Sequence, residues 1–491
     1  MSSTVAASGS GSKGRPKESR RWLKRRVPRE HLYRLVPRPQ PERLGRRDAW
    51  SVIRRLLRAW WLWMLTAIVA YSVGHLGVAI PAAIAAFVFY NTTPVRHPAA
   101  FALETNLTVD SAEFATTVAG MTATALVEGN AVAIFNDGDA IYPPMLDAIA
   151  AARHSITMEQ YILWDGEVGR RFADAFAERA AAGVAVKIIL DAIGSSTVGA
   201  TILQTLERGG CQLAWFQPIR WYTLDRANHR DHRKSLIVDG RVAFTGGAGM
   251  ADHWAIGTRG SPAWRDVQIR VEGPAALVQQ SGFAYNWLNL TGEILGGREF
   301  FPLPRRAGSV AVQVIQSSPG LGPTAAGTVH LLALQCARRT VSIANSYFIP
   351  DDRMIDILAR ACRRGVTVTL MLAGRRNDTW WARQNSVRLY GQLLQAGVQI
   401  YEYTPAMLHQ KVMIVDDAWA TVGTTNFDNR SFALNDETNV CFTDRALVRE
   451  LQETFARDLT HSRHITMKTW RRRGVVQRAT ELFASVIEDQ L

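Results

Sequence analysis

The segment NHRDHRKSLIVDGRVAFTGGAG at residues 228–249 decides the fold, because a polar cluster in it leads directly into an apolar run that predicts a strand. A histidine, a lysine and an aspartate in this segment follow the spacing HxKxxxxD: His232, Lys234 and Asp239. Residues 408–426, LHQKVMIVDDAWATVGTTN, repeat this spacing with His409, Lys411 and Asp416. One copy is a weak motif, whereas two copies with the same surroundings indicate an internal duplication.

The spacing within each copy suits chemistry at phosphorus. Side chains two residues apart in an extended strand point to the same face, so each histidine shares a face with its lysine. A neutral imidazole can attack phosphorus or carry a proton near neutral pH, and a neighbouring ammonium can hold a phosphate oxygen. A buried structural histidine beside a surface lysine explains either copy alone about as well, but for both copies together it becomes a minor explanation.

The segments around the two copies also repeat one order of predicted elements. A strand at 154–163, an amphipathic helix at 167–183 and a buried strand at 184–194 precede the first copy. The second copy follows the same order, at 340–350, 352–365 and 366–374. Alternating strands and helices predict α/β layers, and two such halves about a pseudo-two-fold axis would bring both histidines to one cleft.

The positive charge of the chain is concentrated at its N-terminus. The 491 residues carry a net charge of +14, and residues 1–58 hold 17 Lys or Arg against 4 acidic residues, which places +13 in this segment. The segment is rich in Ser, Gly, Pro and Arg and has little apolar periodicity, so we expect a basic disordered tail. Such a tail can bind anionic lipid or nucleic acid, or serve only to fix membrane topology.

The next segment, residues 59–90, contains no charged side chain. It exceeds the ~20 residues of one membrane crossing and falls short of the ~40 of two, so it predicts either one span or a short hairpin. Aromatic residues at both ends resemble interfacial belts, and Gly74, His75, Gly77 and Pro81 interrupt its middle. The basic tail favours a cytoplasmic N-terminus, while the side occupied by the remaining chain depends on the number of crossings.

Several further segments extend the pattern across residues 120–491, among them MEQYI at 158–162, WRDVQIRVEGPA at 264–275 and TNFDNRSFALNDE at 425–437. In these segments the chain resembles the phospholipase D superfamily and, within it, the bacterial cardiolipin synthases. The resemblance implies a duplicated phospholipase D-type α/β fold with two halves about a pseudo-two-fold axis. We expect the halves at 100–298 and 299–491, preceded by the membrane segment.

The resemblance also implies roles for residues outside the two motifs. Asp266 and Glu437 would orient the two imidazoles, as a triad carboxylate does. Asp239 and Asp416 would be structural partners in salt bridges, and Asn426 would contact phosphate. The first-half counterpart of Asn426 is Gly249, which departs from the family pattern and removes one possible donor to a phosphate oxygen.

A membrane-bound phosphatidyltransferase is the function that the resemblance implies, joining two phosphatidylglycerols into cardiolipin with release of glycerol. One histidine would form a phosphohistidine and the other would move protons, with His232 as nucleophile and His409 as general acid. No metal or other cofactor is expected, since both lysines and Asn426 can offset phosphate charge. The alternatives are a hydrolytic phospholipase D, a superfamily nuclease and a non-catalytic lipid-binding relative. We expect the bacterial inner membrane as location, phosphatidylglycerol as partner and no nucleic acid.

Overall fold

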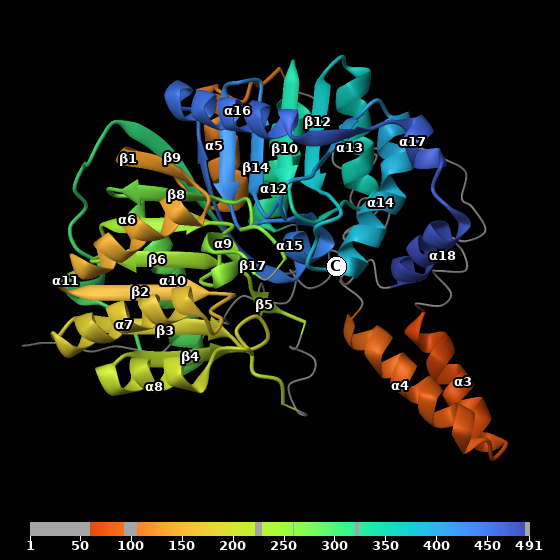
Figure 1. Cartoon of the computed structure of the whole chain (residues 1–491), viewed down its shortest axis with the longest axis horizontal. Helices are drawn as coiled ribbons and strands as arrows, with labels where there is room; N and C mark the ends of the chain where they lie inside the picture. The colour runs from red at the N-terminus through yellow and green to blue at the C-terminus, as the bar shows by residue number, and fades with distance from the viewer. Residues whose placement is uncertain (1–58, 93–105, 221–227, 259, 320–323, 487–491) are drawn as a thin grey trace, which may run out of the picture. The chain divides into compact units, whose positions relative to one another are not determined.

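The computed structural model describes residues 59–92, 106–220, 228–258, 260–319 and 324–486. The basic segment 1–58 lies outside these ranges, so the prediction of a disordered tail stays a prediction. Within the described ranges the chain forms a mixed α/β structure in which strands of both halves join one 16-stranded sheet. Figure 1 shows the sheet with its covering helices.

The strand order repeats outward from the centre of this sheet. The first half contributes β1 (Val127–Asn136), β8 (Val267–Glu272), β7 (Val242–Gly246), β6 (Lys234–Val238), β2 (Ser155–Gln160), β3 (Ala185–Asp191) and β4 (Gln212–Phe216). The second half contributes β9 (Val310–Ser317), β17 (Asn435–Phe442), β15 (Trp419–Gly423), β14 (Lys411–Val415), β10 (Thr340–Asn345), β12 (Thr367–Ala373) and β13 (Gln399–Tyr403). β18 (Ser462–Ile465) adds an edge strand beyond β13, and the short β5 (Arg230–Asp231) pairs with β17.

The pairing senses follow the same rule in both halves, which shows the duplication predicted from the two motifs. From the centre outward, the first four strand pairs in each half are antiparallel, ending with the pair that contains β2 or β10. The next two pairs are parallel. β1 and β9 pair antiparallel where the halves meet. This arrangement is the one that an approximate two-fold axis through the β1–β9 pair produces.

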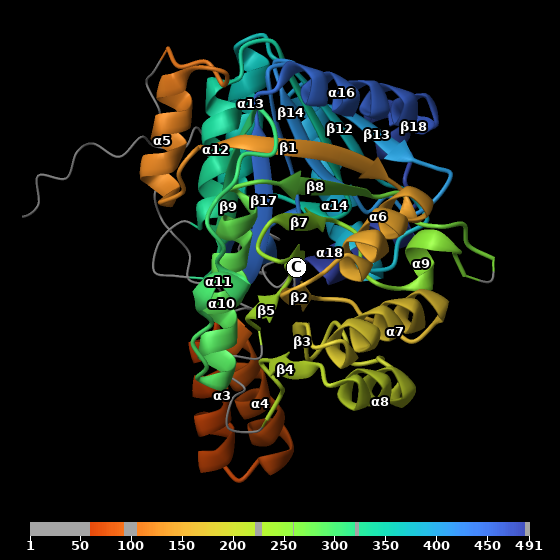
Figure 2. The same ribbon diagram turned by 90° about the vertical axis from the view of Figure 1, so that its left-hand side faces the viewer.

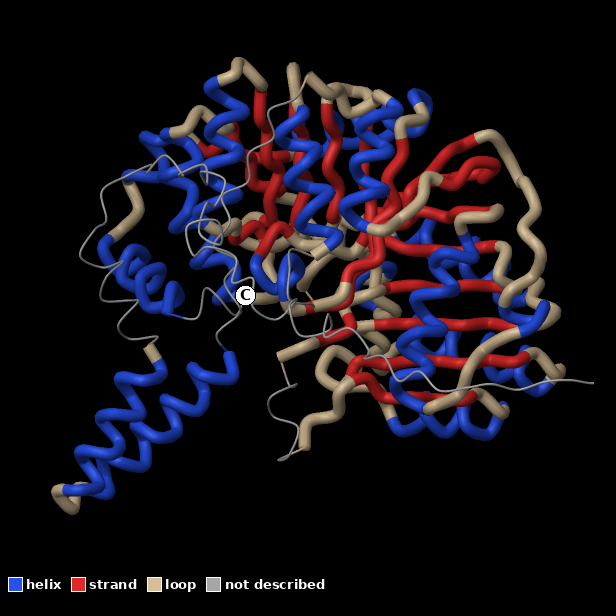
Figure 3. Tube along the Cα trace, turned by 180° about the vertical axis from the view of Figure 1, so that it is seen from behind, coloured by secondary structure: helices blue, strands red, loops and turns tan. Residues whose placement is uncertain are grey.

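Helices cover both faces of the sheet, so its strands are buried on both sides. In the first half α6 (Gly138–Ala150), α7 (Glu167–Ala181) and α8 (Ala200–Gly209) lie on one face and α10 (Ala276–Thr291) on the other, as Figure 2 shows. The second half is layered likewise, and Figure 3 shows its strands between helices. These helices are α12 (Ala325–Cys336), α13 (Asp352–Arg363), α14 (Trp380–Gln395) and α16 (Arg445–Thr460). The strands and helices predicted at 154–194 and 340–374 all form.

The apolar segment folds as two helices, α3 (Trp60–Ser72) and α4 (Leu76–Thr92), joined at Gly74, whose φ is +80°. They pack through small residues, among which Ala70, Ala82 and Ala86 are buried. Large side chains such as Leu65, Ile68 and Ile84 point outward and are more than half exposed. In the described part of the chain, no helix has the length and apolarity that a membrane crossing needs.

Shorter elements complete the described chain. They are α5 (Ala112–Thr122), α9 (Asp252–Ala255), α11 (Gly297–Phe300), β11 (Phe348–Ile349), β16 (Phe427–Asp428), α15 (Asn429–Ala433), α17 (Met467–Arg471) and α18 (Val475–Ala484).

Candidate active site

The two HxK pairs occupy equivalent places in the sheet. His232 and Lys234 stand where β6 begins, and His409 and Lys411 stand where β14 begins. All four side chains are buried. Each lysine ammonium donates to the carbonyl of its own histidine, at 2.9 Å in the first half and 2.6 Å in the second. This contact holds each ammonium beside its imidazole, as the strand periodicity predicts.

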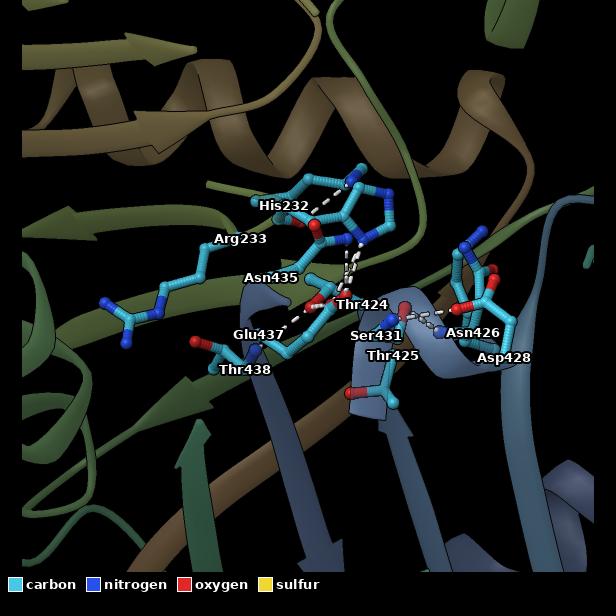
Figure 4. A network of polar contacts seen from close by, with 12 residues as sticks. His232, Arg233, Thr424, Thr425, Asn426, Asp428, Ser431, Asn435, Glu437 and Thr438 are labelled. Atoms are coloured by element: carbon cyan, nitrogen blue, oxygen red, sulfur yellow. Dashed lines mark hydrogen bonds and ion pairs between the residues drawn. The ribbon is translucent and has the colours of Figure 1, made fainter. Parts of the chain in front are cut away.

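Each imidazole is oriented by a carboxylate from the opposite half. His232 Nδ1 lies 3.0 Å from Glu437 Oε1 and 3.1 Å from Oε2, and His409 Nδ1 lies 2.8 Å from Asp266 Oδ2. Figure 4 shows Glu437 at the start of β17 reaching His232. A carboxylate at Nδ1 favours the tautomer with its proton on that nitrogen, which leaves Nε2 with a lone pair.

Backbone hydrogen bonds also connect each histidine to the opposite half. The His232 amide donates to the carbonyl of Asp436 at 3.0 Å, and the His409 amide donates to the carbonyl of Arg265 at 2.7 Å. In each case the acceptor is the residue directly before the orienting carboxylate. One half therefore fixes both the main chain and the ring of the other half's histidine.

Burial and charge keep the two imidazoles neutral at pH 7. Burial is the main cause that lowers the pKa of His232 to about 4, and the charges of Lys234 and Lys411 add to it against the opposing effect of Glu437. Burial and the Lys411 charge likewise lower the pKa of His409. A neutral imidazole is the form that can attack phosphorus.

The pKa values of the two lysines and of Glu437 also reflect both burial and neighbouring charges. Burial, with the Lys411 charge, lowers the pKa of Lys234 to about 7, and burial lowers the pKa of Lys411 to about 8. Burial alone would raise the pKa of Glu437, but its contacts with His232 and Thr424 lower it. The charge of Lys411 thus disfavours the charged form of Lys234. The negative charge of an incoming phosphate would offset this repulsion.

Different donors hold the two orienting carboxylates. Trp254 Nε1 donates to Asp266 Oδ2 at 2.7 Å, which is the oxygen that also faces His409. Thr424 donates from its hydroxyl to Glu437 Oε2. Trp254 is fully buried, and its ring lies edge-on to the His409 ring with 5.3 Å between centroids. These two donors fix the carboxylates on which the tautomers of the imidazoles depend.

The departure at Gly249 has a steric explanation. A Cβ atom placed on Gly249 would lie 2.8 Å from the Trp254 ring and 2.9 Å from Ile162 Cβ. The indole thus occupies the space that an asparagine side chain would need. In the second half, Asn426 accepts a hydrogen bond from Ser346 at 2.9 Å, and Lys411 donates to the same Ser346 hydroxyl at 2.8 Å. Because its oxygen is held in this way, the amide nitrogen of Asn426 is the end that can donate to phosphate.

The aspartates that end the motifs accept hydrogen bonds from backbone amides of the described chain. Asp239 accepts hydrogen bonds from the amides of residues 153–155 at 2.7–3.2 Å. Asp416 accepts from the amides of residues 338–340 at 2.6–2.9 Å. Each carboxylate therefore fixes the start of the neighbouring strand, β2 or β10, at the end of the motif strand away from its histidine. The sequence interpretation expected salt bridges at these two residues, whereas the contacts that the structure describes for their carboxylates are to backbone amides.

Polar side chains surround each residue whose backbone carbonyl accepts a hydrogen bond from a histidine amide. In one cluster Arg265 bonds to Asp458 at 2.9 Å and pairs with Asp137. In the other, Asn286 donates to Asp436 at 3.0 Å and to Glu159 at 2.6 Å. Asn286 and Asp458 occupy equivalent places in the repeated sequences FAYN and FARD, on α10 and α16.

Sequence reasoning missed the residues that position the carboxylates and Asn426: Trp254, Thr424 and Ser346. Thr424 stands inside the second motif segment at 408–426 and Ser346 inside the strand predicted at 340–350, so their closeness to motif residues was a usable signal. Trp254 carries no such signal, because its contact to Asp266 depends on how the loop around α9 folds back.

Comparisons with known proteins identify the family of the chain. A family model described as "Cardiolipin synthase, PLD-like domain" matches residues 145–256 and 331–459. "Cardiolipin synthase 1" of Bacillus cereus is 31% identical over 367 residues, covering 73% of this chain and 72% of that protein. "Cardiolipin synthase" of Oceanobacillus iheyensis is 31% identical over 74% of this chain and 76% of that protein.

Among solved structures, phosphatidylserine synthase of Haemophilus influenzae matches with a TM-score of 0.60 and 12% identity, over 77% of this chain and all of that chain. At this identity the likeness speaks for the fold alone. The family model and the relatives go further, and they show that the chain belongs to the cardiolipin synthase family with its PLD-like domain.

Proposed function

We propose that this phosphatidyltransferase joins two phosphatidylglycerol molecules into cardiolipin and releases glycerol. The observation that carries the proposal is the pair of buried imidazoles, each held by a carboxylate of the opposite half and each beside a lysine ammonium. Two such groups are what a double displacement at phosphorus requires, one as nucleophile and one as proton carrier.

In the first step Nε2 of His232 attacks the phosphorus of one phosphatidylglycerol. The bond from phosphorus to the glycerol head group breaks, and His409 gives a proton to the departing oxygen. His409 takes up this proton when substrate binds, because the negative charge of the phosphodiester favours the charged imidazole. Lys234, Lys411 and the amide of Asn426 offset the charge on the phosphoryl oxygens. The products are free glycerol and a phosphatidyl group bonded to His232.

In the second step the terminal hydroxyl of another phosphatidylglycerol attacks the same phosphorus. His409, now neutral, takes the hydroxyl proton, and the bond between nitrogen and phosphorus breaks. Cardiolipin forms, His232 is neutral again, and His409 is ready for the next first step. Water in place of the second lipid would give phosphatidic acid by the same sequence.

The assignment of His232 as nucleophile rests on the family resemblance, since the two imidazoles have closely similar surroundings. A phosphodiester with an activated leaving group separates the two roles, because its departure needs no proton. We expect His409→Ala to form phosphohistidine from this compound and His232→Ala to form none, as measured by mass spectrometry after acid quench. Label on His409 in the His232→Ala protein would reverse the roles.

We also propose that the α3–α4 hairpin anchors the protein in the bacterial inner membrane, with the basic N-terminus in the cytoplasm. Support comes from its inverted packing, with alanines between the helices and large apolar side chains outward, which suits helices surrounded by lipid. The full-length protein should resist extraction by alkaline carbonate, whereas a chain that starts near Ala100 should be released. Release of the full-length protein by carbonate would remove this part of the proposal.

Product analysis tests the reaction itself. Purified protein given phosphatidylglycerol in detergent should yield cardiolipin and glycerol in equal amounts, identified by mass spectrometry. Phosphatidic acid as the sole lipid product would assign hydrolysis instead of transfer.

A further inference from the structure

α18 faces the protein with its polar side and the outside with its apolar side. Glu481 is 1% exposed and accepts hydrogen bonds from Arg473 Nε at 2.8 Å and Gln477 Nε2 at 3.1 Å. The apolar side chains that recur at helical spacing on the opposite side are exposed: Val475, Val476, Leu482 and Phe483. A helix at a water interface buries its apolar stripe, so this orientation indicates that an apolar phase lies outside α18.

Two tryptophans at the start of α14 enlarge this surface. Trp380 and Trp381 are both exposed, and their rings lie edge-on with 4.8 Å between centroids. The Trp381 ring also contacts Phe483, at 5.5 Å between centroids. We call the combined surface the α14–α18 patch, and its residues are Trp380, Trp381, Val475, Val476, Leu482 and Phe483. Figure 1 shows α18 and α17 beside α14.

Basic side chains outnumber acidic ones around the α14–α18 patch, whose neighbours include the exposed carboxylate of Asp378. Residues 467–486 contain five basic residues and a single acidic one, the buried Glu481. Four of the basic residues are exposed, and two more follow β12 in the loop that leads to α14: Lys468, Arg471, Arg472 and Arg478, then Arg375 and Arg376. Exposed tryptophan and aliphatic side chains with a basic rim are typical of helices that lie in the interface of an anionic bilayer.

The patch is joined to the catalytic residues by one short connection. Asp378 and Thr379 directly precede Trp380, and the Tyr347 hydroxyl donates to Asp378 and lies 3.3 Å from the Thr379 hydroxyl. The Tyr347 ring in turn lies edge-on to the His409 ring, with 6.3 Å between centroids. The residues directly before Trp380 and the side chain of Tyr347 therefore connect the α14–α18 patch to the imidazole of His409.

We infer that the α14–α18 patch is a second membrane contact, in which the catalytic part docks on the headgroup region of an anionic bilayer independently of the α3–α4 hairpin. In this position the apolar side chains enter the acyl boundary and the arginines meet lipid phosphates. The contact holds the His409 side of the site at the lipid surface from which its substrates come. The docking itself requires no turnover.

Depth-dependent fluorescence quenching tests the contact in the full-length protein. In a Cys362→Ala background, where the remaining native cysteines are buried, Val476→Cys is labelled with an environment-sensitive fluorophore. The matched control is Glu207→Cys, an exposed position on α8 far along the chain from the patch. Both proteins are reconstituted in vesicles of phosphatidylcholine and phosphatidylserine that contain lipid spin-labelled in its acyl chain.

We expect several-fold stronger quenching at residue 476 than at residue 207, and a clear loss of this quenching in a Phe483→Glu variant or in pure phosphatidylcholine vesicles. Equal, weak quenching at both positions would overturn the inference. So would a fluorophore at 476 that is shielded without lipid quenching, because a second copy or another segment of the chain would then cover the patch. An enzyme without transferase activity that still shows the quenching would contradict the proposed function and leave the docking intact.

Discussion

Exchanging each orienting carboxylate for its amide tests the crossed arrangement of the site. Glu437→Gln keeps the shape of the side chain but removes the charge that faces Nδ1 of His232, at 3.0 and 3.1 Å. An amide can present its NH2 group to Nδ1, which would favour the tautomer with the proton on Nε2 and block attack. Asp266→Asn removes the charge that faces Nδ1 of His409 at 2.8 Å.

The expected loss is large because each pair is fully buried. In a serine protease the corresponding carboxylate-to-amide change lowers kcat by about 10⁴. In Glu437→Gln, Thr424 can hold the amide oxygen at the Oε2 position, which turns the NH2 group toward His232. In Asp266→Asn, Trp254 donates to the oxygen that faces His409 and the Val267 amide donates to the other oxygen, so the NH2 group meets one of these donors in either orientation. We therefore expect each variant to lose about 10³-fold or more in kcat, which is about 4 kcal/mol at 1.36 kcal/mol per factor of ten.

The assay uses the phosphodiester with an activated leaving group, because it separates the two histidines. If the carboxylates act across the halves, Glu437→Gln should behave like His232→Ala, and Asp266→Asn like His409→Ala. This correspondence holds whichever histidine is the nucleophile. The crossed pairing would be refuted if Asp266→Asn matched His232→Ala and Glu437→Gln matched His409→Ala. Thermal unfolding of all four variants controls for loss of fold.

Four further outcomes follow from the geometry. First, the pKa of His232, lowered to about 4, means that the unfolded chain binds a proton there between about pH 6.5 and 4 while the folded chain does not. Stability should fall as pH drops through this window, by up to about 3 kcal/mol from this residue, and urea unfolding at pH 7 and 4.5 should show a smaller difference in His232→Gln. Second, the pKa values of Lys234 and Lys411, about 7 and about 8, predict proton uptake by the two lysines when inorganic phosphate binds at pH 8, measurable by calorimetry in buffers of different ionisation enthalpy. Third, Gly249→Asn should not restore the family pattern but should push against Trp254 and lower the free energy of unfolding by about 1–3 kcal/mol; unchanged stability would show that the indole moves aside easily. Fourth, Asp239→Ala should lower the melting temperature by removing acceptors for three backbone amides, with activity falling in proportion to the folded fraction; a loss of kcat in fully folded protein would give Asp239 a chemical role.

Much of the fold follows from local pattern and from repetition. The strands at β2, β3, β10 and β12 carry enough apolar residues in short runs to be recognised, and the second HxKxxxxD copy shows that the chain is duplicated. The turn of the apolar hairpin coincides with Gly74, which the sequence already marks as an interruption. These features depend on residues close together in the chain, so a single sequence contains them.

The crossed contacts depend instead on how the halves meet. Asp266 follows His232 by 34 residues, and spacing alone suggests no preference between that histidine and His409. The choice is made by the β1–β9 and β5–β17 pairings, which join residues at least 180 positions apart. The orientation of α18 is also hidden, because its apolar spacing would normally predict a helix face turned to the core.

The crossed carboxylates also bear on the synthesis of the protein in the cell. A nascent chain that has completed the first half already contains His232 and Lys234, but Glu437 and the carbonyl of Asp436 are still to be translated. His232 cannot be oriented until β17, near the end of the chain, has joined the sheet beside β9. Truncated or stalled products are therefore inert toward membrane lipid, and activity begins only when almost the whole chain has folded.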